Sequence, residues 1–288
     1  MWMNRLKTLL LLTLLSGIFL FIGHLFGGQH GLQIALIMAL AMNFITYFFS
    51  EQIVLSLYRA QPLDRATYGW IYDTVHELAN TMEMPAPKLW MVKTPMANAF
   101  ATGRNPHHAS VVVTTGIVDI LEKHELRGVL AHELSHIKNR DVLIGTIAAT
   151  IATAIGYVAH MMQYAAFWGS MHGKKRGGNP ISMLLVAIFM PLAATLIQLA
   201  ISRSREYLAD ETGACVSGDP LALASALEKL HTHVRHTHMD PRDTQHATTA
   251  ALCIVHPFNG HGLVDLFSTH PPMHKRIARL KEMCHKIY

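Results

Sequence analysis

Four long apolar stretches dominate the pattern of hydrophobic and polar positions along the chain. They run over residues 6–26, 32–49, 142–168 and 181–201. A helix needs roughly 20 predominantly apolar residues to cross the hydrocarbon core of a membrane, and each stretch has about that length. The pattern therefore predicts about four transmembrane or membrane-associated helices. His160, Gln163 and Pro191 interrupt the last two stretches, so a pair of long buried helices in a soluble fold is the alternative there.

The first two stretches predict a helical hairpin with its turn at residues 27–31. Arg5 and Lys7 precede the first stretch as in a signal peptide, but no small-residue cleavage site follows and the second stretch begins almost at once. The same basic residues predict a cytoplasmic N-terminus, so the segments flanking the last two stretches would also be cytoplasmic. The basic residues 174–176 disagree, because their short loop would lie outside. Whether the last two stretches cross the bilayer fully stays open.

The remaining segments predict the short elements of an α+β, mostly helical fold. β-branched and apolar residues bounded by Pro and Gly predict two strands of a small sheet, at 88–92 and 110–114. Helical patterns cover residues 122–139, about 221–230, and the end of the chain from about 273. The chain divides into an N-terminal helical hairpin (1–55), a first part of the α+β domain with the strands of the sheet and the helix over 122–139 (56–141), a pair of apolar helices (142–201) and a second part of the same domain (202–288).

The composition favours a membrane protein with reduced cysteines. Charged residues make up 15% of the chain and hydrophobic residues 51%, whereas a soluble domain has about 25% charged residues. The net charge of +5 forms no basic stripe, which argues against a nucleic-acid partner. Cys215, Cys253 and Cys284 are odd in number and far apart, so neither a disulfide framework nor a cysteine zinc site is expected.

The segment His132-Glu133-Leu134-Ser135-His136 is the strongest candidate for chemistry. On a helix, residues four apart lie on one face, so His132 and His136 can bind one zinc ion. Glu133 lies beside them and can take a proton from a water on the metal. The chain holds 20 histidines, so the pattern needs support from elsewhere in the sequence.

Two carboxylates after the last apolar stretch provide that support. Glu206 and Asp210 are also four residues apart; Glu206 can serve as the third metal ligand, and Asp210 can accept a hydrogen bond from a ligand imidazole. Two apolar stretches separate the motifs, so both lie on the same side of the membrane. The alternative is a pair of solvated acids on a helix.

The segment from Asn98 to Gly103 has the short side chains and mixed polarity of an exposed edge strand. Such an edge can pair with an extended peptide through main-chain hydrogen bonds. A surface loop that ends in a glycine turn is the alternative reading of this segment.

Together, the segments HELSH, SRSREYLAD and NAFATG resemble the HtpX-type membrane zinc metalloproteases, relatives of the CAAX prenyl endopeptidases. The resemblance covers nearly the whole chain and includes the segment around His270 and Arg276. It implies a zincin-like, gluzincin-type protease domain on the cytoplasmic face of a bacterial inner membrane, with one Zn²⁺ per chain. It also implies turnover of misfolded or damaged membrane proteins, often under stress. ATP is not expected to take part, because no P-loop is present.

The resemblance also implies roles for individual residues. His132, His136 and Glu206 would be the zinc ligands, Glu133 the catalytic acid and base, and Asp210 the carboxylate behind a ligand. Substrate backbone would bind at Asn98 and Ala99, and the active site or the developing oxyanion would be stabilised by His270 and Arg276.

Other readings of the histidines stay open. A membrane di-iron oxygenase of the His-box kind would use His132 and His136, but no HxxHH pair follows them. A metal-binding transport protein would handle the ion without hydrolysis. The dense histidines of residues 231–238 are either a second metal site or a solvated surface segment. Oligomeric state and substrates are not predicted.

Overall fold

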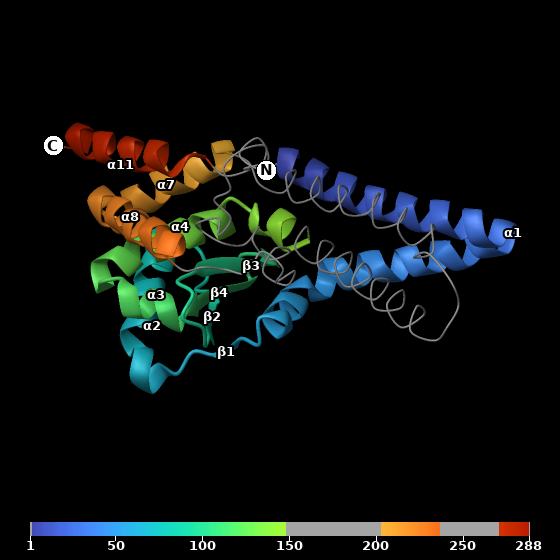
Figure 1. Ribbon diagram of the computed structural model, residues 1–288, viewed down its shortest axis with the longest axis horizontal. Coiled ribbons are helices and arrows are strands. Elements are labelled where there is room, and N and C mark those ends of the chain that lie inside the picture. Colours follow the sequence, from blue (N-terminus) through green and yellow to red (C-terminus); the bar gives the residue numbers. More distant parts are fainter. Residues whose placement is uncertain (1, 148–202, 237–270, 288) are drawn as a thin grey trace, which may run out of the picture.

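The computed structural model describes residues 2–147, 203–236 and 271–287 (Figure 1). His160, Pro191 and most of the last two apolar stretches lie outside these residues. The described elements are α1 (Trp2–Leu57), β1 (Gln61–Pro62), α2 (Arg65–Thr81), β2 (Lys88–Val92), β3 (Ala99–Asn105), β4 (His108–Thr114), α3 (Thr115–Ile120), α4 (Lys123–Lys138), α7 (Arg203–Ser217), α8 (Pro220–His236) and α11 (Met273–Ile287).

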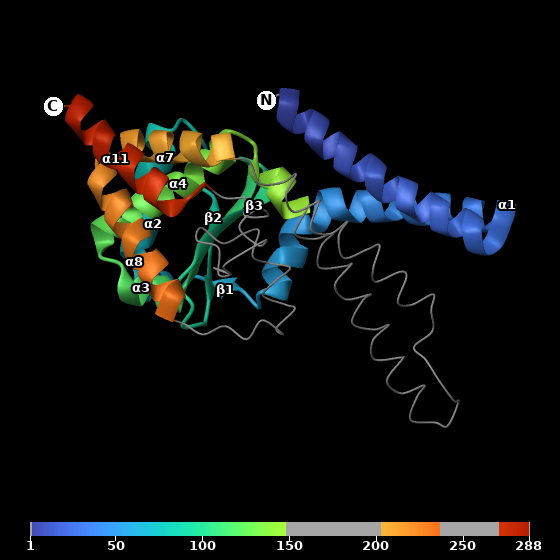
Figure 2. The same ribbon diagram turned by 45° about the horizontal axis from the view of Figure 1, so that its top comes forward.

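Helix α1 folds back on itself as a long hairpin that projects from the rest of the chain (Figures 1 and 2). The break is at Gly28, whose φ of 55° and ψ of −135° suit a residue without Cβ. Asn43 Nδ2 donates to Ser16 Oγ at 2.8 Å and joins the two halves. Among the described residues, one helix, Gly28–Leu57, is long and apolar enough to cross a membrane, with a mean hydropathy of 1.9. The count of four such helices stays a prediction.

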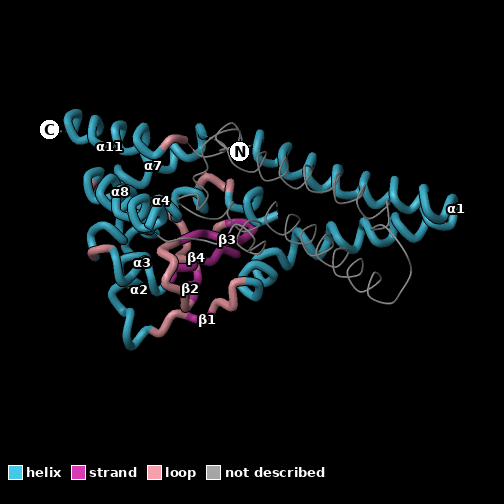
Figure 3. Tube along the Cα trace, in the orientation of Figure 1, coloured by secondary structure: helices cyan, strands magenta, loops and turns pink. Residues whose placement is uncertain are grey.

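A four-stranded sheet of order β1-β2-β4-β3 forms the centre of the domain (Figure 3). β2 and β4 are parallel, and β3 and β4 are antiparallel. The strand predicted at 88–92 is confirmed at both ends, and the one predicted at 110–114 begins two residues earlier, at His108. Asn105 Oδ1 accepts the backbone N–H groups of His107 and His108 and closes the turn from β3 to β4.

The predicted edge strand is present, but its predicted exposure is wrong. β3 occupies the edge of the sheet, yet Ala99, Phe100 and Thr102 are at most 2% exposed. The reason is that both faces of the strand are covered. Phe100 packs with Val54 and Leu55 at the end of α1, whereas the opposite face lies against α4. The surface-loop reading of this segment is therefore excluded.

Helix α4 is the central helix of the domain and packs against α7, α8, α2 and the sheet. The prediction of a helix over 122–139 is confirmed to within one residue at each end. It begins where the Glu122 N–H donates to Glu125 Oε2 at 2.8 Å. Apolar residues on several sides of α4 are fully buried, among them Leu126, Val129, Leu130 and Leu134. The predicted helices near 221 and 273 begin at Pro220 and Met273.

Candidate metal centre

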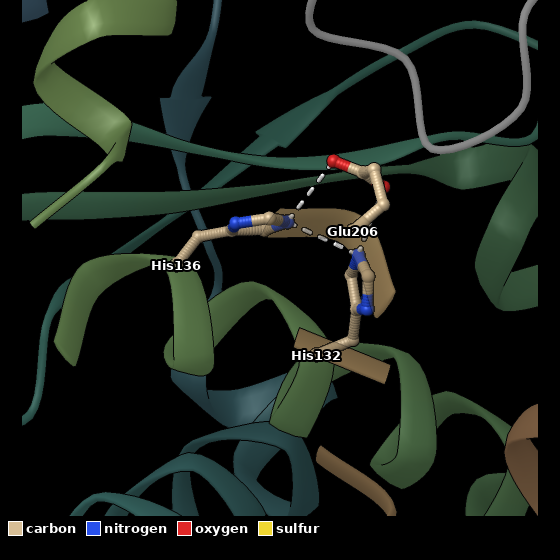
Figure 4. Close-up of side chains that lie close together, drawn as sticks. All are labelled: His132, His136 and Glu206. Carbon is tan, nitrogen blue, oxygen red and sulfur yellow. Dashed lines mark hydrogen bonds and ion pairs between the residues drawn. The ribbon is translucent and has the colours of Figure 1, made fainter. Parts of the chain in front are cut away.

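Two imidazoles on α4 form the base of the site. His132 and His136 are one turn apart, and their rings are perpendicular, at 88°. Their Nε2 atoms lie 3.2 Å apart and point toward the same space (Figure 4). His132 is 1% exposed, whereas the side chains of His136 and Glu206 are 16% and 12% exposed, so this space is buried on the His132 side and partly open on the other.

Glu206 on α7 completes a group of three. Its carboxylate oxygens lie 3.7 Å from His132 Nε2 and 3.5 Å from His136 Nε2. The ligand atoms of the three residues lie within 4.8 Å of one another. The structure thus brings together the three residues predicted as metal ligands, although 69 residues lie between His136 and Glu206 in sequence. No other group of this kind occurs within the described ranges, which include His231 and His233.

A glycine allows α7 to approach α4 this closely. Gly213 packs against the backbone of His132, and a Cβ at Gly213 would lie 2.9 Å from the His132 nitrogen. Any side chain at residue 213 would therefore push α7, and Glu206 with it, away from the two imidazoles.

Both imidazoles have a carboxylate behind them. His132 Nδ1 lies 3.0 Å from Asp210 Oδ1, as predicted for Asp210. His136 Nδ1 lies 3.2 Å from both oxygens of Asp141, a contact that sequence reasoning missed. With Nδ1 facing a carboxylate, the neutral tautomer carries its proton on Nδ1 and directs the lone pair of Nε2 into the site. Two lone pairs 3.2 Å apart repel each other unless a proton or a metal cation lies between them.

Arg276 on α11 anchors one of these carboxylates. Its Nε and Nη2 donate to the two oxygens of Asp210 at 2.8 and 2.7 Å, and Nη1 lies 3.6 Å from Glu206 Oε2. Burial alone would raise the pKa of Asp210, but the guanidinium outweighs it and holds that pKa well below its ordinary value. The structure therefore places Arg276 at the predicted site, behind Asp210. His270 lies outside the described residues.

The charges of the site leave a negative excess. Among the described residues, four carboxylates, of Glu133, Asp141, Glu206 and Asp210, face two guanidinium groups, of Arg205 and Arg276. With neutral imidazoles, the excess is two negative charges, which a divalent cation would balance. Burial would lower the pKa of His136, but Asp141 with Glu206 and Glu133 raises it to about 10. Without a cation, the carboxylates therefore draw a proton onto this imidazole.

Glu133 connects the helix to the edge strand. Its side chain is buried, and Oε2 accepts the backbone N–H of Ala101 at 2.9 Å. Burial is the largest influence on this carboxyl group and raises its pKa. A buried carboxylate with a raised pKa, beside a candidate metal position, has the properties of a general base.

The backbone of β3 alternates between its two sides. Asn98 faces inward, since its N–H donates to Thr114 Oγ1 at 2.9 Å and its carbonyl accepts the Thr114 N–H at 3.0 Å. Ala101 and Gly103 face outward, where their N–H groups donate to Glu133 and to Thr146 Oγ1. By this alternation, the outward backbone groups next to the site belong to Ala99 and Ala101.

A helix that carries HExxH, packed against a second helix whose glutamate lies beside the two imidazoles, is typical of metal-dependent peptidases. Residues 65–284 match peptidase family M48, and the chain belongs to that family. It is 48% identical to a protein of Sulfurihydrogenibium sp. named Protease HtpX homolog, over 99% of this chain and 97% of the relative. A protein of the same name from Paraburkholderia phytofirmans is 47% identical over 97% of each chain.

The fold also resembles that of a solved structure. The crystal structure of S. mikatae Ste24p matches 97% of this chain and 66% of its own, with a TM-score of 0.52 and 18% identity. The family and its relatives therefore define a metalloprotease, and the relatives together with helix Gly28–Leu57 indicate association with a membrane.

Proposed function

We propose that the protein is a membrane-bound zinc endopeptidase that cleaves misfolded or damaged membrane proteins. One Zn²⁺ would be held by His132, His136 and Glu206, with Glu133 as the catalytic base. The convergence of two Nε2 atoms and a carboxylate on one point carries this proposal. The resemblance to HtpX-type proteases supports the quality-control role and a place in the bacterial inner membrane, and the absence of a P-loop motif from the sequence supports independence of ATP. Arg5 and Lys7 support a site on the cytoplasmic side.

The dimensions of the site support zinc. Bonds of about 2.0–2.1 Å in a tetrahedron give edges of roughly 3.3–3.4 Å between ligand atoms. The two Nε2 atoms lie 3.2 Å apart, close to such an edge, and Glu206 places Oε1 3.5 Å from His136 Nε2 and Oε2 3.7 Å from His132 Nε2. Two imidazoles and one carboxylate leave a fourth corner, as catalytic zinc sites require.

The residues of the chain would divide the work of hydrolysis. When bound, zinc lowers the pKa of a water from ~15.7 to about 7 and polarises the scissile carbonyl. Glu133 takes the proton of the attacking water and delivers it to the leaving amine. The Ala101 N–H holds Glu133 Oε2 in place, which leaves Oε1 to receive the proton. Asp210 keeps the His132 ring oriented.

The substrate would bind as an added strand on the edge of β3. The outward backbone groups of Ala99 and the carbonyl of Ala101 suit main-chain pairing with an extended peptide. Because the Ala101 N–H contacts the base directly, the scissile bond would lie beside this residue. Ala99 and Ala101 are at most 7% exposed, so pairing with a substrate strand requires a change of conformation at this edge.

The test is a comparison of Glu133→Gln with wild type in detergent. Zinc content should stay at one per chain while casein cleavage falls at least ~100-fold, the usual contribution of a general base. Glu211→Gln, at an exposed glutamate on α7, is the matched control and should cleave as wild type does. A chelator should abolish wild-type cleavage, and zinc should restore it. Undiminished cleavage by Glu133→Gln, or bound iron in place of zinc, would refute the proposal.

A further inference from the structure

The turn that ends α4 has an unusual conformation directly after the second ligand. Arg140 N–H donates to the Ile137 carbonyl at 3.1 Å, and Asp141 N–H donates to the His136 carbonyl at 3.2 Å. These are the two hydrogen bonds of a Schellman motif. Arg140 takes the left-handed position of this motif with a φ of 55°, which is uncommon for a residue with a side chain.

The motif changes where the Asp141 side chain lies. Five residues along a continuous α-helix correspond to a rotation of about 140° from the starting residue, so residue 141 would point away from the face of His136. The left-handed step at Arg140 instead turns the chain back over the last helical turn. As a result, both Asp141 oxygens lie 3.2 Å from His136 Nδ1, and the carboxylate is 4% exposed.

Each of the two histidine ligands thus has a buried carboxylate behind its ring, and the two carboxylates come from different parts of the chain. His132 faces Asp210, which binds Arg276. His136 faces Asp141, which interacts electrostatically with Arg205, next to Glu206 on α7. The pair of Asp210 and Arg276 links α7 and α11, which both follow the apolar stretches in sequence. The Asp141 carboxylate lies at the junction of α4 with Val142, where the third apolar stretch begins.

We infer that Asp141 is a positioning residue for the metal centre. It accepts the Nδ1 proton of His136 and fixes the ring so that Nε2 points at the ion. The Schellman turn at Arg140 sets its position. The inference rests on the proposed ligand role of His136. Carboxylates in this arrangement contribute about 10–100-fold to metal affinity.

The test measures zinc affinity of the full-length chain in detergent by competition with a chromophoric chelator. Asp141→Ala should bind zinc 10–100-fold more weakly than wild type. Asp141→Asn should bind zinc more tightly than Asp141→Ala, because its amide keeps an acceptor oxygen for the His136 ring. Asp119→Asn, at an exposed aspartate on α3, is the matched control. With Co²⁺ as the probe, Asp141→Ala should alter the visible absorption spectrum of the bound ion, which a loss of stability alone would not do.

A second pair of variants tests the turn without changing Asp141. Arg140→Gly suits the left-handed conformation and should keep wild-type zinc affinity. Arg140→Ile disfavours it and should weaken zinc binding as Asp141→Ala does. The inference is overturned if Asp141→Ala and Arg140→Ile bind zinc within twofold of wild type. If wild type itself binds no zinc, or if His136→Ala binds it normally, the proposed function fails instead.

Discussion

Gly213→Ala tests whether the close packing of α7 on α4 builds the metal centre. Gly213 lies seven residues after Glu206 on α7, and its Cα faces the backbone of His132. The added Cβ would lie 2.9 Å from the His132 nitrogen and 3.0 Å from its Cα, whereas ordinary contact begins at 3.4 Å. Because both neighbours are backbone atoms of a buried helix, no side-chain rotation can make room, and the helices must separate by about 0.5 Å.

Two opposing effects set the expected stability of this variant. Overpacking of a core costs about 1–3 kcal/mol, and alanine gains about 1 kcal/mol over glycine in a helix. The metal-free variant should therefore lose about 0–2 kcal/mol. Metal binding is more sensitive, because a shift of about 0.5 Å exceeds the ±0.2 Å tolerance of metal–ligand distances. We expect zinc affinity to fall at least tenfold, which corresponds to about 1.4 kcal/mol.

Urea unfolding in a chelator and zinc competition would separate these two effects. Gly69→Ala in α2 is the matched control, since nothing lies within 4 Å of its added Cβ. It should gain up to about 1 kcal/mol of stability and leave zinc affinity unchanged. A Gly213→Ala protein with wild-type zinc affinity would show that the helix spacing does not fix Glu206, and the reasoning would be wrong.

Two further predictions concern buried charges. Arg276→Met should destabilise the metal-free protein by about 3–5 kcal/mol, because Asp210 is left buried without its guanidinium; a loss below 1 kcal/mol in urea unfolding would contradict this. Burial would raise the pKa of Glu125, but hydrogen bonds from Lys229 and Ser225 outweigh it and lower that pKa below 4.5. The stability that Glu125 adds is therefore present above pH 4.5 and is lost at lower pH as it protonates. The difference in unfolding free energy between wild type and Glu125→Gln should accordingly shrink as the pH falls below 4.5, and an unchanged difference would count against the ion pair.

Much of the fold and the ligand set could be predicted because their signals are local. The β-branched and apolar residues bounded by Pro and Gly predicted β2, and the helical pattern predicted α4, each nearly to the residue. One turn of helix brings His132 and His136, four residues apart, to the same face. The prediction of Glu206 rested on its four-residue spacing to Asp210, on the two apolar stretches between the motifs and on the family resemblance.

Asp141 and the burial of β3 could not be predicted because they depend on tertiary structure. A residue five positions after His136 faces it only through the left-handed turn at Arg140, and arginine carries no signal for that conformation. The edge strand has the composition of an exposed segment, but Phe100 meets the end of α1 and the other face meets α4. Neither contact can be predicted from the local sequence of the strand.

The charged groups of the metal centre come from both parts of the domain, one before and one after the apolar residues 142–201, and they compensate one another only when these parts are packed together. Burying an ion costs several kcal/mol, and apolar residues in the same place often stabilise a fold more, so stability alone does not account for Asp210, Arg276 and Glu206 inside this core. These charged groups fix the relative positions of three helices, because α4 carries the imidazoles, α7 the carboxylates of Glu206 and Asp210, and α11 the guanidinium of Arg276. Each part alone would leave uncompensated charge. Because the carboxylates of the assembled site outnumber its guanidinium groups, binding of a divalent ion in place of the proton on His136 stabilises the joined state over the separated one. Metal binding is therefore expected to couple the two parts that the apolar residues 142–201 separate in sequence.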